Sequence, residues 1–470
     1  MANTTLGVIF GNRGTFPEKP ITDARTEMRN TLERLGIDSV MITEDDTELG
    51  GVETFSDARQ CAELFRRNAE CIDGLVVCLP NFGDERGIAE TIKQADLGVP
   101  VLIQACPDEP NQMSVDHRRD AYCGKISVCN NLHQADIPFS LTDLHVVSPS
   151  SDRFEADLQR FTAICRVVNG LRGARIGAIG ARPAAFNTVR FSEKILEANG
   201  ISVTPIDWSE LMAAARGLAD GDERVVTKAG ELTGYTRTAT VPDLKMLTQS
   251  KLGVVIDEWV AANHIDATAI QCWTSVQENM GVNTCSLMSM MGQGGHPSAC
   301  EVDVMGALTM LAFQLASGVP SALVDWNNNY GDDPDKCVLF HCGNWPMAYL
   351  PDGEMTTLPI LENALGKDVS WGALDGRTPS GPVTFGRLST DDTLGQIHGY
   401  IGRGDLTDDP LDTFGTRAVM RVAGLNDLMH LVCRAGFEHH AAISLSDTID
   451  ALREAFETYL GWPIHEHVSG

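Results

Sequence analysis

The sequence predicts an α/β protein with two doubly wound parallel-sheet domains followed by a smaller β-rich C-terminal domain. Three observations lead to this fold class. Short apolar runs alternate with amphipathic segments of helix length at the start of the chain, and the alternation resumes near Arg172. After about residue 350 the pattern changes to short β-type runs separated by turn residues. We therefore expect domains at residues 1–171, 172–350 and 351–470.

The first domain is predicted from alternating strands and helices. The expected strands are LGVIF, SVMIT, GLVVCLP and PVLIQA, and the expected helices span residues 22–35, 56–71 and 85–96. This spacing indicates a parallel sheet covered by helices on both faces. Such sheets carry ligand loops at the carboxyl ends of their strands, which here are GNRGTFP (11–17) and PNFGDE (80–85).

The second domain is expected to repeat this architecture. It opens with the strand RIGAIG (175–180), and residues 243–258 are predicted as a helix–strand pair that ends in VVIDEW. A helix over 299–317 and the strand SALVDW (321–326) complete it. In the third domain, GPVTFGRLS, LGQIHGYIGRGDL, TRAVMRVAG and AAISLS are predicted as strands, and residues 447–459 as a helix.

The chain is strongly acidic, with 64 acidic against 36 basic residues and a formal net charge of −28. An acidic surface repels phosphate backbones and anionic lipids, so we expect neither nucleic-acid nor membrane binding. The chain enters the strand LGVIF almost at once, without a basic segment before it, so we do not expect secretion. Its 13 cysteines include no CxxC pair, which predicts reduced thiols in a cytoplasmic protein.

A set of metal-ligand-type side chains in the second half of the chain is the main functional signal. It comprises Glu301, Asp325, His341 and the pair His439-His440, each where a predicted helix or strand begins or ends. Two carboxylates with imidazole suit a divalent cation such as Mn²⁺ or Mg²⁺. The same carboxylates could move protons between neighbouring carbons of a bound substrate.

Each of these residues also has a structural interpretation. Ser298 followed by Glu301 fits a capping box, and Asp325 fits a turn that leads into NNNYGDDPD. His341 after an apolar strand is compatible with a hydrogen-bonded core histidine. Because successive strand residues face opposite ways, at most one residue of the pair His439-His440 is expected to face a given metal.

The motifs GNRGTFP, PNFGDE, GGHPSACEVDV, LVDWNN, FHCGN and EHH occur in this order along the chain. In these motifs the sequence resembles the L-fucose/L-arabinose isomerase superfamily, and it is closer to the fucose-isomerase-like branch. The resemblance covers most of the chain. Its C-terminal domain is much shorter than that of fucose isomerases, so the resemblance does not imply the identity of the sugar.

The resemblance implies roles for individual residues. Glu301 and Asp325 would bind the metal and also form the proton-transfer pair, and His440 would be a third ligand. His341 matches a metal-ligating histidine of arabinose isomerases, whereas the fucose-type site manages without it. The metal would be Mn²⁺, with Mg²⁺ or Co²⁺ as alternatives.

The resemblance also implies substrate contacts and an assembly. Arg13 matches a loop that reaches the active site of a neighbouring subunit, which implies a homo-oligomer of trimeric or hexameric symmetry with its active site at the subunit interface. Phe186, Gln271, Trp273 and His439 would contact the sugar.

The expected function is that of a metal-dependent aldose–ketose isomerase. It would act on an open-chain pentose or deoxyhexose, fucose- or arabinose-like, through a cis-enediol. Two alternatives stay open on the sequence alone: an epimerase or carbon–carbon lyase that uses the same enediolate, and a non-catalytic sugar-binding protein.

Overall fold

The computed structural model describes residues 4–468 and divides into two compact units. One unit holds the chain up to Asn169 together with Asp450–Gly461, and the other holds Gly170–Ile449 together with the chain from Trp462 onward. The sheets are a five-stranded sheet in the first unit and a four-stranded and a nine-stranded sheet in the second. The predicted fold class, with two parallel-sheet regions followed by a β-rich region, is confirmed.

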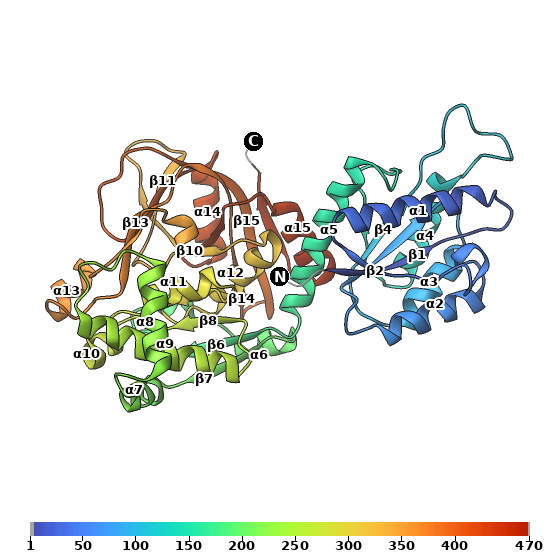
Figure 1. Ribbon diagram of the computed structural model, residues 1–470. Coiled ribbons are helices and arrows are strands. Elements are labelled where there is room, and N and C mark those ends of the chain that lie inside the picture. Colours follow the sequence, from blue (N-terminus) through green and yellow to red (C-terminus); the bar gives the residue numbers. More distant parts are fainter. Residues whose placement is uncertain (1–3, 469–470) are drawn as a thin grey trace. The chain divides into compact units, whose positions relative to one another are not determined.

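The N-terminal unit is built on a parallel sheet in the strand order β2-β1-β3-β4-β5. Figure 1 labels β1, β2 and β4 of this sheet among its helices. Its strands are β1 (Thr5–Phe10), β2 (Asp38–Val40), β3 (Gly74–Leu79), β4 (Val101–Ala105) and β5 (Ser140–Leu141). Its helices are α1 (Lys19–Arg34), α2 (Phe55–Arg67), α3 (Glu85–Ala95), α4 (Ala121–Gln134) and α5 (Asp152–Leu171).

Helices cover both faces of this sheet because alternate strand residues point to opposite sides. Val8 of β1 packs with Met28 of α1 and Phe161 of α5 in one core. The next residue, Ile9, belongs to a second core that contains Phe65 of α2. The sheet is therefore buried on both faces, as the near-continuous apolar strands predict.

The C-terminal segment Asp450–Gly461 also belongs to this unit. It contains most of α15 (Ile449–Glu454) and a π-helical turn, Ala455–Tyr459. The Tyr459 hydroxyl lies 2.8 Å from the Ser140 hydroxyl and donates to the backbone carbonyl of Val101 at 3.2 Å. These contacts, distant in sequence, attach to the first sheet a segment that the sequence pattern placed in the third domain.

The second unit begins with a parallel sheet in the order β7-β6-β8-β9. Its strands are β6 (Arg175–Ile179), β7 (Ser202–Ile206), β8 (Ala267–Ile270) and β9 (Ser298–Cys300). Its helices are α6 (Glu193–Ala198), α7 (Trp208–Gly217), α8 (Glu223–Tyr235), α9 (Asp243–Ala262), α10 (Ser275–Met280), α11 (Cys285–Gln293) and α12 (Val304–Ser317).

The strand predicted at VVIDEW is wrong, because these residues lie inside the helix α9. Leu252, Val255, Ile256 and Val260 recur at helical spacing, and all four belong to the core of this unit. Packing of this apolar face outweighs the β preference of the branched side chains.

The nine-stranded mixed sheet has the order β12-β13-β16-β11-β10-β17-β14-β15-β18. Its strands are β10 (Ser321–Asn329), β11 (Lys336–His341), β12 (Glu354–Thr356), β13 (Ala373–Arg377), β14 (Gly381–Asp391), β15 (Gln396–Thr407), β16 (Thr416–Arg421), β17 (His440–Ser444) and β18 (Ile464–His467). Its helices are α13 (Pro359–Leu365) and α14 (Leu425–Ala435). β10 and β11 lie near its centre, so the expected boundary at residue 350 falls within this sheet.

Helix α12 links the two sheets of the second unit. It contacts β8 and β9 of the parallel sheet and β10, β14 and β17 of the mixed sheet. Its sequence, VMGALTMLAFQLAS, is apolar on almost every side, as a helix enclosed by two sheets requires. The candidate site lies at the N-terminal end of this helix.

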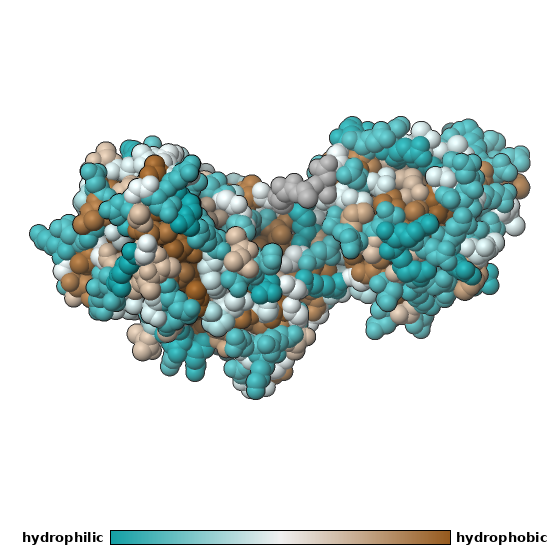
Figure 2. Space-filling model, turned by 60° about the horizontal axis from the view of Figure 1, so that its bottom comes forward, coloured by the Kyte–Doolittle hydropathy of each residue, from teal (hydrophilic) through white to brown (hydrophobic). Residues whose placement is uncertain are grey.

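Hydrophilic residues cover much of the face drawn in Figure 2, in keeping with the acidic composition. Within residues 4–468 every helix is too short or too polar to cross a membrane. All 13 cysteines lie in the described residues, and each is a free thiol.

Candidate active site

The structure brings four of the predicted ligand-type residues together at the start of α12. His440 Nε2 lies 3.3 Å from Asp325 Oδ1 and 3.6 Å from Glu301 Oε2. His341 Nε2 lies 3.9 Å from the same Glu301 oxygen. Residues separated by up to 139 positions in the sequence thus form one cluster.

Strand register explains how three of these residues meet. Asp325 of β10 pairs with His440 of β17 on one side and with Phe340 of β11 on the other, next to His341. The prediction that Asp325 lies at the carboxyl end of a parallel strand is wrong, since β10 continues to Asn329 and both neighbours are antiparallel. The central position of β10 in the mixed sheet brings the carboxylate between two histidine-bearing strands.

Glu301 occupies the short turn between β9 and α12. Glu301 and Val302 both have a φ of 56°, a left-handed conformation that side chains other than glycine rarely adopt. Strain of this kind, on the order of 1–3 kcal/mol per residue, persists where the surrounding structure enforces it, often at functional sites. The turn directs the carboxylate towards Trp273, whose Nε1–H donates to Oε1 at 3.0 Å.

The capping-box interpretation of Glu301 is wrong. Ser298 lies within β9, and its hydroxyl accepts a hydrogen bond from Thr268. Asp303 is the N-cap of α12, with its side chain accepting from the Gly306 amide at 2.8 Å. Glu301 is left free for another role.

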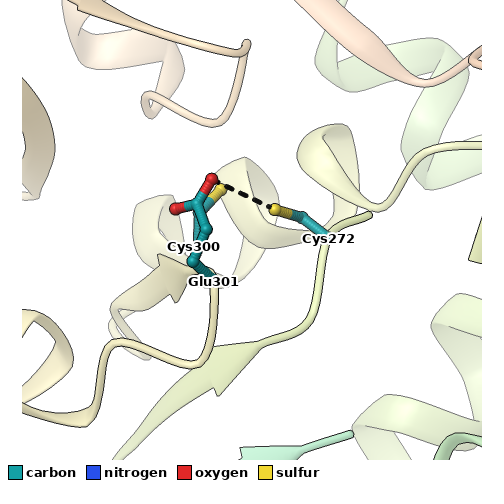
Figure 3. A group of neighbouring side chains, drawn as sticks. All are labelled: Cys272, Cys300 and Glu301. Carbon is teal, nitrogen blue, oxygen red and sulfur yellow. Dashed lines mark hydrogen bonds between the residues drawn. The ribbon is translucent and has the colours of Figure 1, made fainter. Parts of the chain in front are cut away.

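Two cysteines, Cys272 and Cys300, lie next to the Glu301 carboxylate (Figure 3). The Cys272 thiol donates to Glu301 Oε1 at 3.6 Å, and Cys300 lies beside it. Burial raises the pKa of the Cys272 thiol to about 11 and also raises that of Cys300. Both side chains are therefore neutral thiols at physiological pH, which suits a hydrogen-bond donor better than a thiolate ligand.

Asp303 connects His440 to a buried ion-pair network. Its Oδ2 lies 2.8 Å from His440 Nδ1 and 2.6 Å from Arg387 Nη1. Arg387 also pairs with Glu438 at 3.0 Å, and its side chain is fully buried. Burial alone would favour a neutral Asp303, but Arg387 and the hydrogen bond with His440 hold its pKa below the usual value.

This network fixes the tautomer of His440. Because the Asp303 carboxylate can only accept, Nδ1 of His440 donates, and Nε2 presents its lone pair to Glu301 and Asp325 whenever the ring is neutral. Metal-binding histidines commonly have a carboxylate on the other ring nitrogen in this way. Without a metal the ring carries protons on both nitrogens and is positively charged. Burial opposes this charge, but the hydrogen bond to Asp303 and the nearby carboxylates raise the pKa of His440 to about 9.

His341 has the opposite tautomer to that of His440. The backbone N–H of Cys342 donates to His341 Nδ1 at 2.8 Å, so the neutral ring carries its proton on Nε2. Burial, reinforced by the neighbouring histidines, lowers the pKa of His341 well below its usual value. In this arrangement Nε2–H is a hydrogen-bond donor facing Glu301 rather than a lone pair.

The two carboxylates have unusual protonation and unmet hydrogen-bonding capacity. Burial raises the pKa of Asp325 to about 7 and also raises that of Glu301, although His440 opposes both shifts. Within residues 4–468, Glu301 Oε2, Asp325 Oδ1 and His341 Nε2 are buried atoms without a hydrogen-bond partner. Orphaned oxygens that face a free imidazole nitrogen fit a divalent cation, which would satisfy them.

His439 also approaches Asp325, with its Nε2 3.7 Å from Oδ1. It precedes β17 rather than lying within it, so strand alternation does not turn it fully away, and its ring centroid lies 4.5 Å from that of His440. His439 is half-exposed, whereas His440 is buried. Burial, together with His440, lowers the pKa of His439 to about 4, so this ring is neutral at physiological pH.

The predicted sugar contacts of the second unit border the same cluster. The Phe186 ring lies 5.3 Å from Trp273 and 5.7 Å from His439, measured between centroids. Gln271 Oε1 accepts a hydrogen bond from the Ala181 amide at 3.1 Å, which fastens the loop after β6 to the end of β8. Arg13 belongs to the N-terminal unit, where it pairs with Glu85 at 2.6 Å.

Two family models match this chain. Residues 7–172 match the N-terminal domain of fucose/sulfoquinovose isomerases, and residues 339–467 match the C-terminal domain of L-fucose isomerase. The chain belongs to the fucose isomerase-like family. The predicted resemblance is thereby confirmed, and the chain is a sugar isomerase by family, which favours an enzyme over a non-catalytic sugar-binding protein.

Curated relatives in this family are named sulfoquinovose isomerases. The protein from Priestia megaterium is 22% identical over 342 residues, which cover 72% of this chain and 74% of that protein. The protein from Clostridium sp. is 24% identical over 312 residues, covering 65% and 67%, and that from Alkalicoccus urumqiensis is 23% identical over 308 residues, covering 63% and 66%.

The sequence of this family member did not reveal the buried network that supports His440. Asp303, Arg387 and Glu438 come from three separate segments, and only the tertiary structure joins them. Two signals were present. Asp303 lies two residues after Glu301 before an apolar helix, and Glu438 directly precedes the histidine pair.

Proposed function

We propose that this family member is a metal-dependent aldose–ketose isomerase that acts on a sulfonated hexose of the sulfoquinovose type. The observation that carries the proposal is the pair of buried carboxylates, Glu301 and Asp325, whose orphaned oxygens face Nε2 of His440. The names of the curated relatives support the sulfonated sugar over a simple pentose or deoxyhexose.

Glu301, Asp325 and His440 would hold the cation, for which Mn²⁺ is our first choice and Mg²⁺ or Co²⁺ are alternatives. When bound, a divalent cation polarises the carbonyl of an open-chain sugar and stabilises negative charge on its oxygens. Asp303 keeps Nε2 of His440 free for this purpose through the hydrogen bond to Nδ1.

The carboxylates would also carry the proton between the reacting carbons. One takes the proton from C2, next to the aldehyde, which leaves a cis-enediolate; the C2 hydroxyl proton moves to the C1 oxygen, and the other carboxyl group, protonated, delivers a proton to C1 to give the ketose. Burial raises the pKa of Asp325 to about 7 in the cation-free site; a bound divalent cation would lower this pKa and hold the carboxylate ionised, as a base requires.

His341 would take part as a neutral donor. Its Nε2–H is buried, faces Glu301 and has no hydrogen-bond partner within residues 4–468. A substrate oxygen between these two residues would accept this hydrogen bond as negative charge develops during enolisation. His341 would therefore bind the substrate and would not be a fourth ligand of the cation.

The assembly expected from the resemblance belongs to the same proposal. A trimer or hexamer in the cytoplasm would place Arg13 of one subunit at the site of its neighbour. The pairing of Arg13 with Glu85 and its position 4.1 Å from the Phe82 ring keep the guanidinium ordered for such a contact. Light scattering coupled to gel filtration, repeated on Arg13→Met, tests the assembly and its dependence on this residue.

Isomerisation in heavy water tests the reaction. The metal-loaded protein is offered sulfoquinovose, its unsulfonated 6-deoxy counterpart, fucose and arabinose, and the products are analysed by NMR for deuterium at the two reacting carbons. We expect a ketose that carries solvent deuterium, and a loss of at least about 100-fold in rate for Glu301→Gln and for Asp325→Asn.

The exposed Glu258→Gln change on α9 is the matched control and should leave the rate unchanged. If the product is an epimeric aldose, the reaction is an epimerisation; if shorter fragments appear, it is a carbon–carbon cleavage. Either result would contradict the isomerase proposal. Undiminished deuterium incorporation in the double variant at Glu301 and Asp325 would refute the two-carboxylate mechanism.

A further inference from the structure

The candidate site is too acidic to receive an anionic sugar without help. Glu301, Asp325, Asp303 and Glu438 supply four carboxylates, and Arg387 is the guanidinium among them. A divalent cation offsets only part of this negative excess. Arg387 is fully buried and already engaged by two carboxylates, so it is not free for a substrate. A sulfonate stays ionised at any physiological pH, so a cationic side chain of this unit that is free to pair with it would favour its binding, besides any contact from Arg13 of a neighbouring subunit.

The loop that follows β6, residues 180–190, lies beside the site. Ile179, the last residue of β6, pairs with Ile270 of β8, so the loop begins next to the strand that leads to Trp273. The hydrogen bond from the Ala181 amide to Gln271 Oε1 fixes its start. Farther along, Phe186 contacts both Trp273 and His439, so the loop borders the cluster.

This loop carries two arginines, Arg182 and Arg190, on either side of Phe186. Among the described residues, the hydrogen bonds of both guanidinium groups go to backbone carbonyls of the loop itself, Pro183 O for Arg182 and Asn187 O for Arg190. Neither charge is neutralised by a carboxylate there. In a chain of net charge −28, this loop therefore carries two positive charges that no carboxylate pairs with among the described residues.

Arg182 is the better placed of the two. It follows directly the amide that Gln271 holds, and it is half-buried, whereas Arg190 is exposed. The Arg182 guanidinium bonds the carbonyl of Pro183, which opens the turn from Pro183 to Phe186, and a backbone hydrogen bond of 2.9 Å closes that turn at the residue whose ring borders His439. A guanidinium offers paired N–H donors that match two oxygens of a sulfonate, which a single ammonium cannot do.

We propose that Arg182 binds the sulfonate of the substrate and thereby selects sulfonated over neutral sugars. The inference rests on the proposed function, since it names the residue that recognises the distal end of that substrate. Arg182 is a specificity residue here. Its charge would also offset the acidic surroundings that otherwise repel the anion.

The test compares Arg182→Met, Arg182→Lys and the same-loop control Arg190→Met in the metal-loaded protein. The readout is the ratio of kcat/KM for sulfoquinovose to kcat/KM for its unsulfonated 6-deoxy counterpart. Loss of a charge-assisted, bidentate contact is expected to lower this ratio by about 10- to 100-fold in Arg182→Met. Arg182→Lys should lose less, and Arg190→Met should stay within about threefold of the unmodified protein.

An unchanged ratio in Arg182→Met, or an equal loss in Arg190→Met, overturns the proposal. A calorimetric titration with dihydroxypropanesulfonate separates this inference from the isomerase proposal, because it needs no turnover. If neither sugar is converted, the proposed function fails, and binding of this short sulfonate to the unmodified protein but not to Arg182→Met still supports the subsite. Equal binding to both proteins, or to neither, refutes it.

Discussion

Replacing Asp303 by Asn tests whether the buried network behind His440 prepares the metal site. Asp303 accepts four hydrogen bonds: Oδ2 from His440 Nδ1 and Arg387 Nη1, and Oδ1 from Arg387 Nη2 and the Gly306 amide. An asparagine has one oxygen and one NH₂ group. In either orientation its NH₂ therefore meets two donors, and the network cannot be restored by a flip.

Two consequences follow, each with its own magnitude. If His440 accepts from the new NH₂ at Nδ1, its proton moves to Nε2 and the lone pair facing Glu301 is lost. Loss of such a supporting carboxylate commonly weakens metal binding by about 10- to 100-fold. Removal of one partner from the buried Arg387 ion pair costs about 3–5 kcal/mol of folding stability.

The assay separates these effects with a matched variant. Glu438→Gln removes the other carboxylate from Arg387 but leaves the bond from His440 to Asp303 intact. Both variants should unfold at lower denaturant concentration than the unmodified protein. Competition with a chromophoric chelator, well below the unfolding temperature, should show weakened Mn²⁺ binding in Asp303→Asn alone. A folded Asp303→Asn protein that binds Mn²⁺ within twofold of the unmodified protein would refute the tautomer argument.

Two further predictions concern the histidines. The pKa of His440, raised to about 9 in the folded metal-free protein, exceeds its unfolded value of about 6.5, so the stability it contributes is present at lower pH and is lost as pH rises. Urea unfolding in the presence of chelator should show a loss of about 2 kcal/mol in the free energy of unfolding between pH 6.5 and 8, and Asp325, with its raised pKa, adds to this loss. His440→Asn should remove the larger part of the loss and leave the part due to Asp325. A flat profile in the unmodified protein would contradict the assignment. His341→Asn should lower kcat by about 100-fold and leave the Mn²⁺ dissociation constant within about threefold, because Nε2–H is a donor; a tenfold weaker metal affinity would show instead that His341 is a ligand.

Local patterns in the sequence determined much of this protein. The alternation of apolar strands and amphipathic helices identified the parallel sheets, since their residues face the core at fixed local periods. The chemistry of the side chains singled out Glu301, Asp325, His341 and His440, which the structure gathers into one cluster. Motif order identified the family.

Tertiary structure decided the rest, because it depends on which distant segments pair. The register of β10 with β17 sets Asp325 opposite His440, between antiparallel neighbours where a parallel strand end was expected. Burial of α9 turned a β-rich run into helix. The tautomer of His440 depends on Asp303, which lies 137 residues away in the sequence, so no local pattern encodes it. A sequence specifies the ligand types, but the direction of each lone pair is set only when the folded chain supplies its partner.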